Sequence, residues 1–89
     1  IPACELKIDR RFTKNLRAHG EDYAIVQSTI GLGHTLKMSV VAEGIEDQAS
    51  LEILRNMGCD YGQGYFYSKP LPVDKFTAMI KFTRTLPVA

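Results

Sequence analysis

Polar side chains that could do chemistry together follow three separate apolar stretches of this sequence. Lys7 and Asp9 come at the end of the first stretch, and Glu43 and Glu46 follow the second. Gln63 lies within the third. A cation, carboxylates and an amide offer charge, proton acceptors and hydrogen-bond donors, and such combinations are typical of catalytic or binding sites.

Each of these residues also has a structural interpretation. Lys7 could extend from an edge strand into water, Glu43 could begin a solvated turn, and Gln63 could hydrogen-bond within a sheet. Taken singly, the structural interpretations are favoured, but the combination on one rim favours a functional site. Three glycines would allow the backbone to approach closely there: Gly44, Gly62 and Gly64.

Three short strands are expected to carry these residues. Residues 6–9 alternate apolar and charged side chains, residues 38–42 form a β-branched strand that stops at Glu43 and Gly44, and residues 61–67 are aromatic and strand-like. Parallel strands would bring the polar residues together at their carboxyl ends, which is where the chemistry of α/β barrels takes place.

Helices are expected between the strands. Residues 12–16 can form one helical turn, and a long helix capped by Asp22 should follow from Tyr23, with its apolar stripe packed on one face. Asp47 should cap the next helix and Gly58 should end it. A last amphipathic helix is expected around residues 73–80, followed by a flexible tail over 83–89. The apolar stripe of this last helix comprises Val73, Phe76, Met79 and Ile80.

The order of these elements predicts an α/β fold of three parallel strands joined by helical crossovers. Three parallel strands alone would leave two unpaired edges, so the chain fits a fragment of a larger sheet or barrel better than a complete domain. The N-terminus, which has neither an initiator Met nor a signal peptide, agrees with that interpretation.

Composition excludes several classes of protein. The chain has 89 residues, of which 45% are hydrophobic and 24% charged, with 11 Lys and Arg against 10 Asp and Glu. These values argue against a disordered tail and against a polybasic protein that binds DNA or RNA polymers, and no apolar run is long enough for a membrane span. Cys4 and Cys59 form no disulfide framework or zinc site, and we expect both to be buried free thiols in a reducing cytoplasm.

Three motifs together resemble the last third of an EAL domain, the bacterial cyclic di-GMP phosphodiesterase. They are residues 6–9 (LKID), 41–46 (VAEGIE) and 58–71 (GCDYGQGYFYSKPL), and the resemblance extends over nearly all of residues 1–89. It implies that the chain supplies the C-terminal strand–helix units of a modified (β/α)8, TIM-like barrel. The Glu-Ala-Leu motif and most metal ligands would belong to a missing upstream part.

The resemblance also implies roles for individual residues. In this family two Mg²⁺ or Mn²⁺ ions activate a water that hydrolyses cyclic di-GMP to the linear dinucleotide pGpG. Glu43 matches a metal ligand, and Lys7 matches an active-site lysine that holds the water or phosphate. The remaining matches are Glu46, which would order a loop; Gln63 and Pro70, which would form the nucleotide pocket; and Asp9, which would position Lys7 or the strand end.

Two classes of function remain open for the parent protein. One is a metal-dependent phosphodiesterase, and the other is a non-catalytic EAL-like module that binds cyclic di-GMP or a protein and signals by doing so. An unrelated α/β fragment is a third alternative. The parent could also carry a sensory or GGDEF-type domain and a membrane tether. The chain alone is expected to be inactive and to associate or swap elements with other copies through its uncovered edges.

Overall fold

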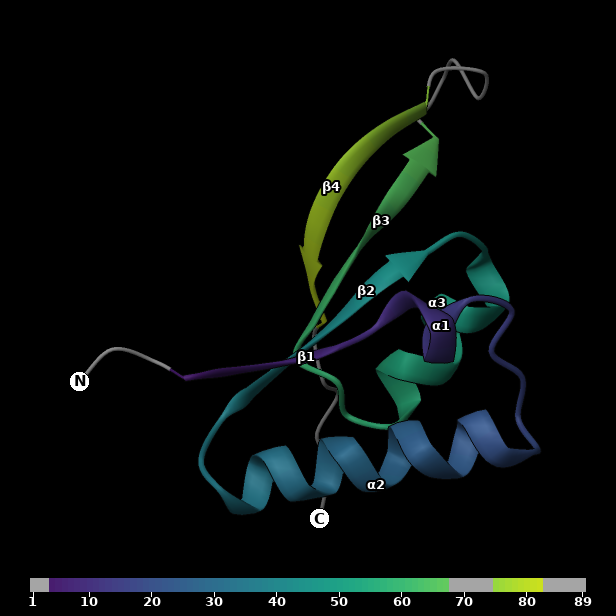
Figure 1. Ribbon diagram of the computed structural model, residues 1–89. Coiled ribbons are helices and arrows are strands. Elements are labelled where there is room, and N and C mark those ends of the chain that lie inside the picture. The colour runs from purple at the N-terminus through teal and green to yellow at the C-terminus, as the bar shows by residue number, and fades with distance from the viewer. Residues whose placement is uncertain (1–3, 68–74, 83–89) are drawn as a thin grey trace, which may run out of the picture.

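The computed structural model describes residues 4–67 and 75–82, which form one sheet and three helices (Figure 1). The tail predicted over residues 83–89 lies outside the described residues. The elements in chain order are β1 (Glu5–Ile8), α1 (Arg10–Thr13), α2 (Glu21–Thr35), β2 (Ser39–Ile45), α3 (Gln48–Asn56), β3 (Tyr61–Tyr67) and β4 (Lys75–Lys81).

The sheet has the strand order β1-β2-β3-β4, and β1, β2 and β3 run parallel. Lys7 is level with Val41, and Val41 is level with Tyr61. Helices α1 and α2 lie in the connection from β1 to β2, and α3 lies in the connection from β2 to β3. The predicted α/β fold of three parallel strands with helical crossovers is therefore confirmed.

The last element differs from the prediction. Residues 75–81, expected within an amphipathic helix, form β4, which pairs antiparallel with β3 from Tyr61↔Lys81 to Tyr67↔Lys75. The spacing of Met79 and Ile80 from Phe76 suits a helix, but Ala78, Ile80 and Phe82 also alternate as in a strand. The unpaired edge of β3 decides between the two patterns, because pairing satisfies its backbone N–H and C=O groups.

The helices cover one face of the sheet (Figure 1). Val40, Ala42 and Leu54 are completely buried there. At Gly33 of α2 an added Cβ would lie 2.7 Å from Val40 Cγ2, so the glycine lets the helix lie close to β2. The buried cluster comprises Ile8, Leu16, Val26, Ile30, Val40, Ala42, Ile45, Leu51, Leu54, Cys59 and Phe82.

The helix boundaries confirm some of the expected caps. The Asp47 carboxylate accepts a hydrogen bond from the Ser50 backbone N–H at 2.7 Å and caps α3. Gly58 has a φ of 87°, the left-handed conformation expected after this helix. Asp22 was expected to cap α2, but Gly20 is the N-cap and Asp22 lies within the first turn.

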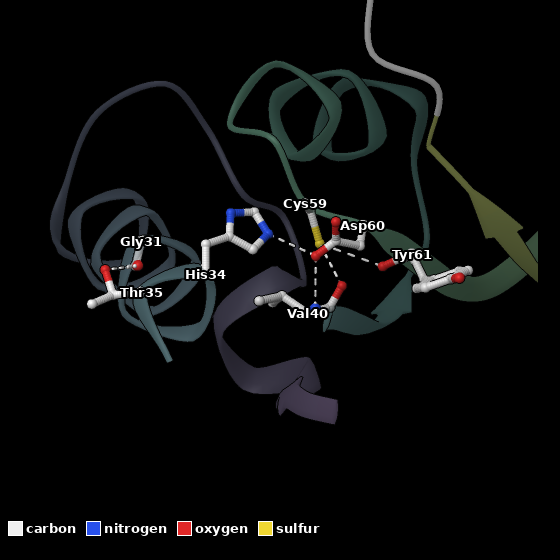
Figure 2. A network of polar contacts seen from close by, with 7 residues as sticks. All are labelled: Gly31, His34, Thr35, Val40, Cys59, Asp60 and Tyr61. Atoms are coloured by element: carbon white, nitrogen blue, oxygen red, sulfur yellow. Dashed lines mark hydrogen bonds and ion pairs between the residues drawn. The ribbon is translucent and has the colours of Figure 1, made fainter. Parts of the chain in front are cut away.

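A polar network joins the amino ends of β2 and β3 to the end of α2 (Figure 2). Asp60 Oδ2 lies 2.7 Å from His34 Nε2 and accepts the Val40 backbone N–H at 2.8 Å. The Asp60 carbonyl accepts from Phe82 N–H at 3.0 Å. One residue therefore ties together α2, β2 and the end of β4.

The two cysteines occupy different environments. Cys59 is buried, with its sulfur 3.4 Å from the carbonyl oxygens of Val40 and Tyr61. Burial raises the pKa of its thiol to about 11, so it stays protonated at neutral pH. Cys4 is exposed, and the expectation that it would be buried is wrong, because it leads into the edge strand β1.

Among the helices of the described residues, none is long and apolar enough to cross a membrane. The longest is α2, with 15 residues.

Replacing Asp47 with Ala should lower the free energy of unfolding by about 1 kcal/mol at neutral pH, because α3 loses its N-cap. The hydrogen bond from Ser50 N–H holds the pKa of the Asp47 carboxyl below its ordinary value of 3.8. A lowered pKa stabilises the folded state above that value, and this contribution is lost as the pH falls through the folded-state pKa. Urea unfolding of both proteins at neutral and strongly acidic pH should show the difference shrinking in acid; a constant difference would contradict the cap.

Candidate functional site

The strand register brings Lys7, Glu43 and Gln63 to one region of the sheet. Lys7 shares a face with its neighbour Val41, and Val41 shares it with Tyr61. Glu43 and Gln63 each follow two residues later on their strands, so alternation keeps them on that face, toward the carboxyl end. Neighbouring strands lie about 4.8 Å apart. The predicted convergence of the three polar residues is therefore consistent with the backbone.

These three side chains keep their polar groups available. Lys7 is exposed, and Glu43 and Gln63 are partly buried. Within residues 4–67 and 75–82, none of the ion pairs or side-chain hydrogen bonds uses the Lys7 ammonium, the Glu43 carboxylate or the Gln63 amide. The site can therefore offer a cation, an anion and a neutral amide to a ligand.

Glu43 lies in an irregular part of β2. The register to β3 passes from Ala42↔Gly62 to Ile45↔Gly64, so two residues of β2 face one of β3. This is a β-bulge, a feature that re-aims side chains and is frequent beside active sites. The strand was expected to stop at Glu43 and Gly44, but the bulge lets it continue to Ile45.

Helix α1 holds this bulge from the chain that follows β1. The completely buried Thr13 hydroxyl donates a hydrogen bond to the Glu43 carbonyl oxygen. Gly44 has a φ of 72°, and an added Cβ there would lie 2.5 Å from Arg10 Cγ. Thr13 and Arg10 therefore determine the backbone position of the glutamate.

Glu46 forms an ion pair just beyond the bulge. Its Oε1 lies 3.3 Å from Arg10 Nη2. Both side chains are considerably exposed, so the pair adds little to stability. It does connect the loop after β2 to α1; the loop-ordering role of Glu46 stays a prediction.

Asp9 lies at the start of α1. Its carboxylate accepts the Arg11 backbone N–H at 2.8 Å and lies 3.2 Å from Arg11 Nε. The backbone hydrogen bond is the main reason that the pKa of this carboxyl is lowered. Asp9 thus positions the first turn of α1; whether it also orients Lys7 stays a prediction.

The glycines on either side of Gln63 serve the packing of the sheet. An added Cβ at Gly62 would lie 2.7 Å from Ile45 Cδ1 and 2.8 Å from the Phe82 ring. At Gly64 it would lie 2.1 Å from the Ile45 carbonyl oxygen. They were expected to allow close approach of the backbone, and the residues that lie against them are Ile45 and Phe82.

Sequence reasoning missed Thr13 and Arg10. Neither was identified as a site residue, although a buried hydroxyl such as that of Thr13 must find a hydrogen-bond partner. The sequence offered one signal, since residues 10–13 follow directly after Asp9 in a helix-capping position. Pro70 lies outside the described residues.

The described residues supply only part of a metal site. No group of three or more His, Cys, Asp or Glu side chains that could hold a metal occurs within residues 4–67 and 75–82. The Glu43 carboxylate is a hard oxygen donor of the kind that Mg²⁺ and Mn²⁺ prefer. It fits the role of one ligand, and further ligands have to come from other residues.

Comparison with known proteins places this arrangement in a family. A family profile described as EAL domain matches residues 1–70. The chain belongs to the EAL domain family. Among curated relatives of this EAL chain, the bifunctional diguanylate cyclase/cyclic di-GMP phosphodiesterase MucR of Pseudomonas aeruginosa is 41% identical over 80 residues, which are 90% of this chain and 12% of MucR. The cyclic di-GMP phosphodiesterase NbdA of the same species is 35% identical over 91 residues, covering 99% of this chain and 12% of NbdA.

Solved structures agree with the assignment. A MucR phosphodiesterase in complex with c-di-GMP matches with 44% identity and a TM-score of 0.69, over 81% of this chain and 32% of that one. The EAL enzyme Bd1971, bound to cAMP and cyclic di-GMP, matches with 38% identity and a TM-score of 0.65, over 72% and 17%. The chain is thus a fragment of a larger, TIM-barrel-like EAL domain.

Replacing Gly44 with Ala should lower the free energy of unfolding by about 1 to 3 kcal/mol, because the residue has a positive φ and its Cβ would collide with Arg10. Gly31→Ala is the matched control, since an added Cβ there meets nothing within 4 Å and the residue lies inside α2. The control should gain up to about 1 kcal/mol from helix propensity. Urea unfolding measures the free energy of unfolding of the Gly44→Ala and Gly31→Ala variants. An equal change in both variants would contradict the bulge geometry.

Proposed function

We propose that this EAL segment belongs to a phosphodiesterase that hydrolyses cyclic di-GMP to linear pGpG. The observation that carries the proposal is the strand register, which brings Lys7, Glu43 and Gln63 to one face of the sheet, near the carboxyl ends of β1 and β2. The MucR relative, named as a phosphodiesterase and solved with c-di-GMP, supports the choice of substrate.

Each residue has a role that its chemistry allows. Glu43 would contribute one carboxylate ligand to a pair of Mg²⁺ or Mn²⁺ ions, which when bound supply Lewis-acid activation of water and charge neutralisation at the phosphate. The Lys7 ammonium would hold the attacking water or a phosphate oxygen and offset developing negative charge. Gln63, and Pro70 beyond it, would line the nucleotide pocket.

The supporting residues act through the backbone. Thr13 fixes the carbonyl of Glu43, and Arg10 fills the space beside Gly44 and pairs with Glu46. Catalytic groups need to be held within a fraction of an ångström, so this support should matter for activity. The proposal places the domain in the cytoplasm, where it would act in signalling together with a sensory or GGDEF-type domain of the parent.

Glu43→Gln and Lys7→Met should separate the two catalytic roles in the full-length domain. Glu43→Gln should lose turnover and weaken Mn²⁺ binding at least about tenfold, because it replaces a ligand. Lys7→Met should lose turnover by about 10²- to 10³-fold while Mn²⁺ affinity stays unchanged, since an ammonium cannot be a ligand.

Calorimetric Mn²⁺ titration and turnover assays on the same samples check this. Lys81→Met, which removes an exposed lysine from β4, is the control and should change neither quantity. Equal loss of metal affinity in both site variants would show that Lys7 is structural. Full cyclic di-GMP affinity without metal-dependent hydrolysis in the unmodified domain would instead indicate the non-catalytic signalling module.

Gln63→Ala should weaken cyclic di-GMP binding by one or two hydrogen bonds, about 1 to 3 kcal/mol, with Mn²⁺ affinity unchanged. The partly buried amide has no partner among the described residues, so the substitution should hardly alter the melting temperature. Measuring cyclic di-GMP affinity and the melting temperature on the same sample distinguishes a pocket residue from a sheet residue. A lower melting temperature with unaltered affinity would assign Gln63 to the sheet rather than to the pocket.

A further inference from the structure

One face of the β3–β4 hairpin lies on the same side of the sheet as the candidate site. Tyr61 shares the site face with Val41, and alternation places Gln63 and Tyr65 on that face as well. Met79 of β4 is the residue directly opposite Gln63. Because cross-strand pairs point to one side of a sheet, Met79 also lies on the face of the candidate site.

Two large apolar side chains on this face are open to solvent. Tyr65 is 49% exposed and Met79 is 53% exposed. The opposite face of the hairpin is packed, since Gly62 lies against Ile45 and the Phe82 ring. Tyr65 and Met79 therefore place exposed apolar surface on the side of the hairpin where the polar site residues lie.

Tyr65 and Met79 are close enough to form one surface. Gln63 pairs with Met79 and Tyr65 pairs with Thr77, so Tyr65 and Met79 are diagonal neighbours across the two strands. Diagonal neighbours lie about 7 to 8 Å apart, within reach of aromatic and long side chains. A thioether beside an aromatic ring is also a favourable contact. We call Gln63, Tyr65 and Met79 the hairpin platform.

The hairpin platform reaches beyond the carboxyl end of β2. Ile45 is the last residue of β2 and is level with Gly64, so Tyr65 lies one residue past the end of that strand. Figure 1 shows the hairpin extending beyond β2. A ligand with a phosphate between Lys7 and Glu43 would therefore have its more distant parts beside the platform.

We propose that the hairpin platform binds one guanine base of cyclic di-GMP, an inference that rests on the proposed function. The Tyr65 ring and the Met79 side chain would pack against the face of the base, and the Gln63 amide would hydrogen-bond to its edge. The three side chains carry no formal charge, so they suit a neutral base better than a phosphate. A purine has apolar faces and a polar edge, which is the combination that the platform offers.

The Gln63 amide favours a base over an apolar protein partner. The side chain is partly buried, and its amide has no partner among the described residues. An apolar side chain docked on Tyr65 and Met79 would cover that amide without satisfying it, which costs free energy. A guanine edge carries both donors and acceptors and can satisfy the amide oxygen and nitrogen together.

Cyclic di-GMP titrations of the full-length domain test the role of Tyr65. Calorimetry in EDTA measures the dissociation constant without metal-dependent loss of the ligand. Tyr65→Thr should raise the dissociation constant by about fivefold to a hundredfold, because a base–aromatic contact is lost. Threonine is chosen because it suits a strand. Tyr65→Phe, which keeps the ring, should stay within about threefold of the unmodified domain.

Met79→Thr tests the second contact and also serves if Tyr65→Thr does not fold. It should raise the dissociation constant by about three- to tenfold. Its melting temperature should stay within about 2 °C, because the side chain is exposed. Lys81→Met is the matched control, since this exposed residue of β4 pairs with Tyr61, farther from the carboxyl end of the sheet. The control should change the dissociation constant by less than about twofold.

The possible results separate this inference from the proposed function. Equal effects of Tyr65→Thr, Met79→Thr and Lys81→Met on the dissociation constant would overturn the platform and leave the proposed function standing. Equal loss of affinity in Tyr65→Phe and Tyr65→Thr would overturn it as well, because the ring would then not be the contact. Absence of cyclic di-GMP binding in the unmodified domain, both with and without Mn²⁺, would overturn the proposed function and the platform together.

Discussion

The parallel pairing of β2 with β1 and β3 is the constraint on which the candidate site depends. Val40, Val41 and Ala42 of β2 are completely buried, so this strand cannot shift its register without exposing apolar side chains. That register carries Glu43 to the same end of the sheet as Lys7 and Gln63. The relative positions of the three polar residues therefore follow from the burial of Val40, Val41 and Ala42 in the strand that also carries Glu43.

The two ends of the sheet differ in how they are held. At the amino end, Asp60 ties β2 to α2 and to the end of β4 through His34 and Phe82. At the carboxyl end, a bulge and a positive φ break the regular ladder, and α1 holds them through Thr13. The sheet thus has rigid strand pairing at one end and a bulge held in place by α1 at the other. This arrangement is suited to presenting polar groups to a ligand.

The proposed site would be shared between this segment and the rest of the EAL domain. The described residues provide a lysine, one well-placed glutamate and an amide, but no three-ligand metal cluster. The exposed side chains of Ile25, Leu32 and Leu36 on α2 and the open edge of β1 show the same incompleteness in the packing of the fold. Strands that complete a sheet also add the residues at their carboxyl ends. The same additional strands would therefore complete both the packing of the fold and the set of site residues.

The sequence by itself determined the local features: the three strand segments, the cap at Asp47, the left-handed Gly58 and the three motifs that identify the family. These depend on nearby residues or on patterns within one element, so they can be read along the chain. Tertiary structure alone decided three others: that residues 75–81 pair as a strand, that Gly62 and Gly64 accommodate Ile45 and Phe82, and that Thr13 reaches Glu43. Each depends on a partner far away in sequence, and no local pattern specifies which distant edge, side chain or carbonyl will be opposite.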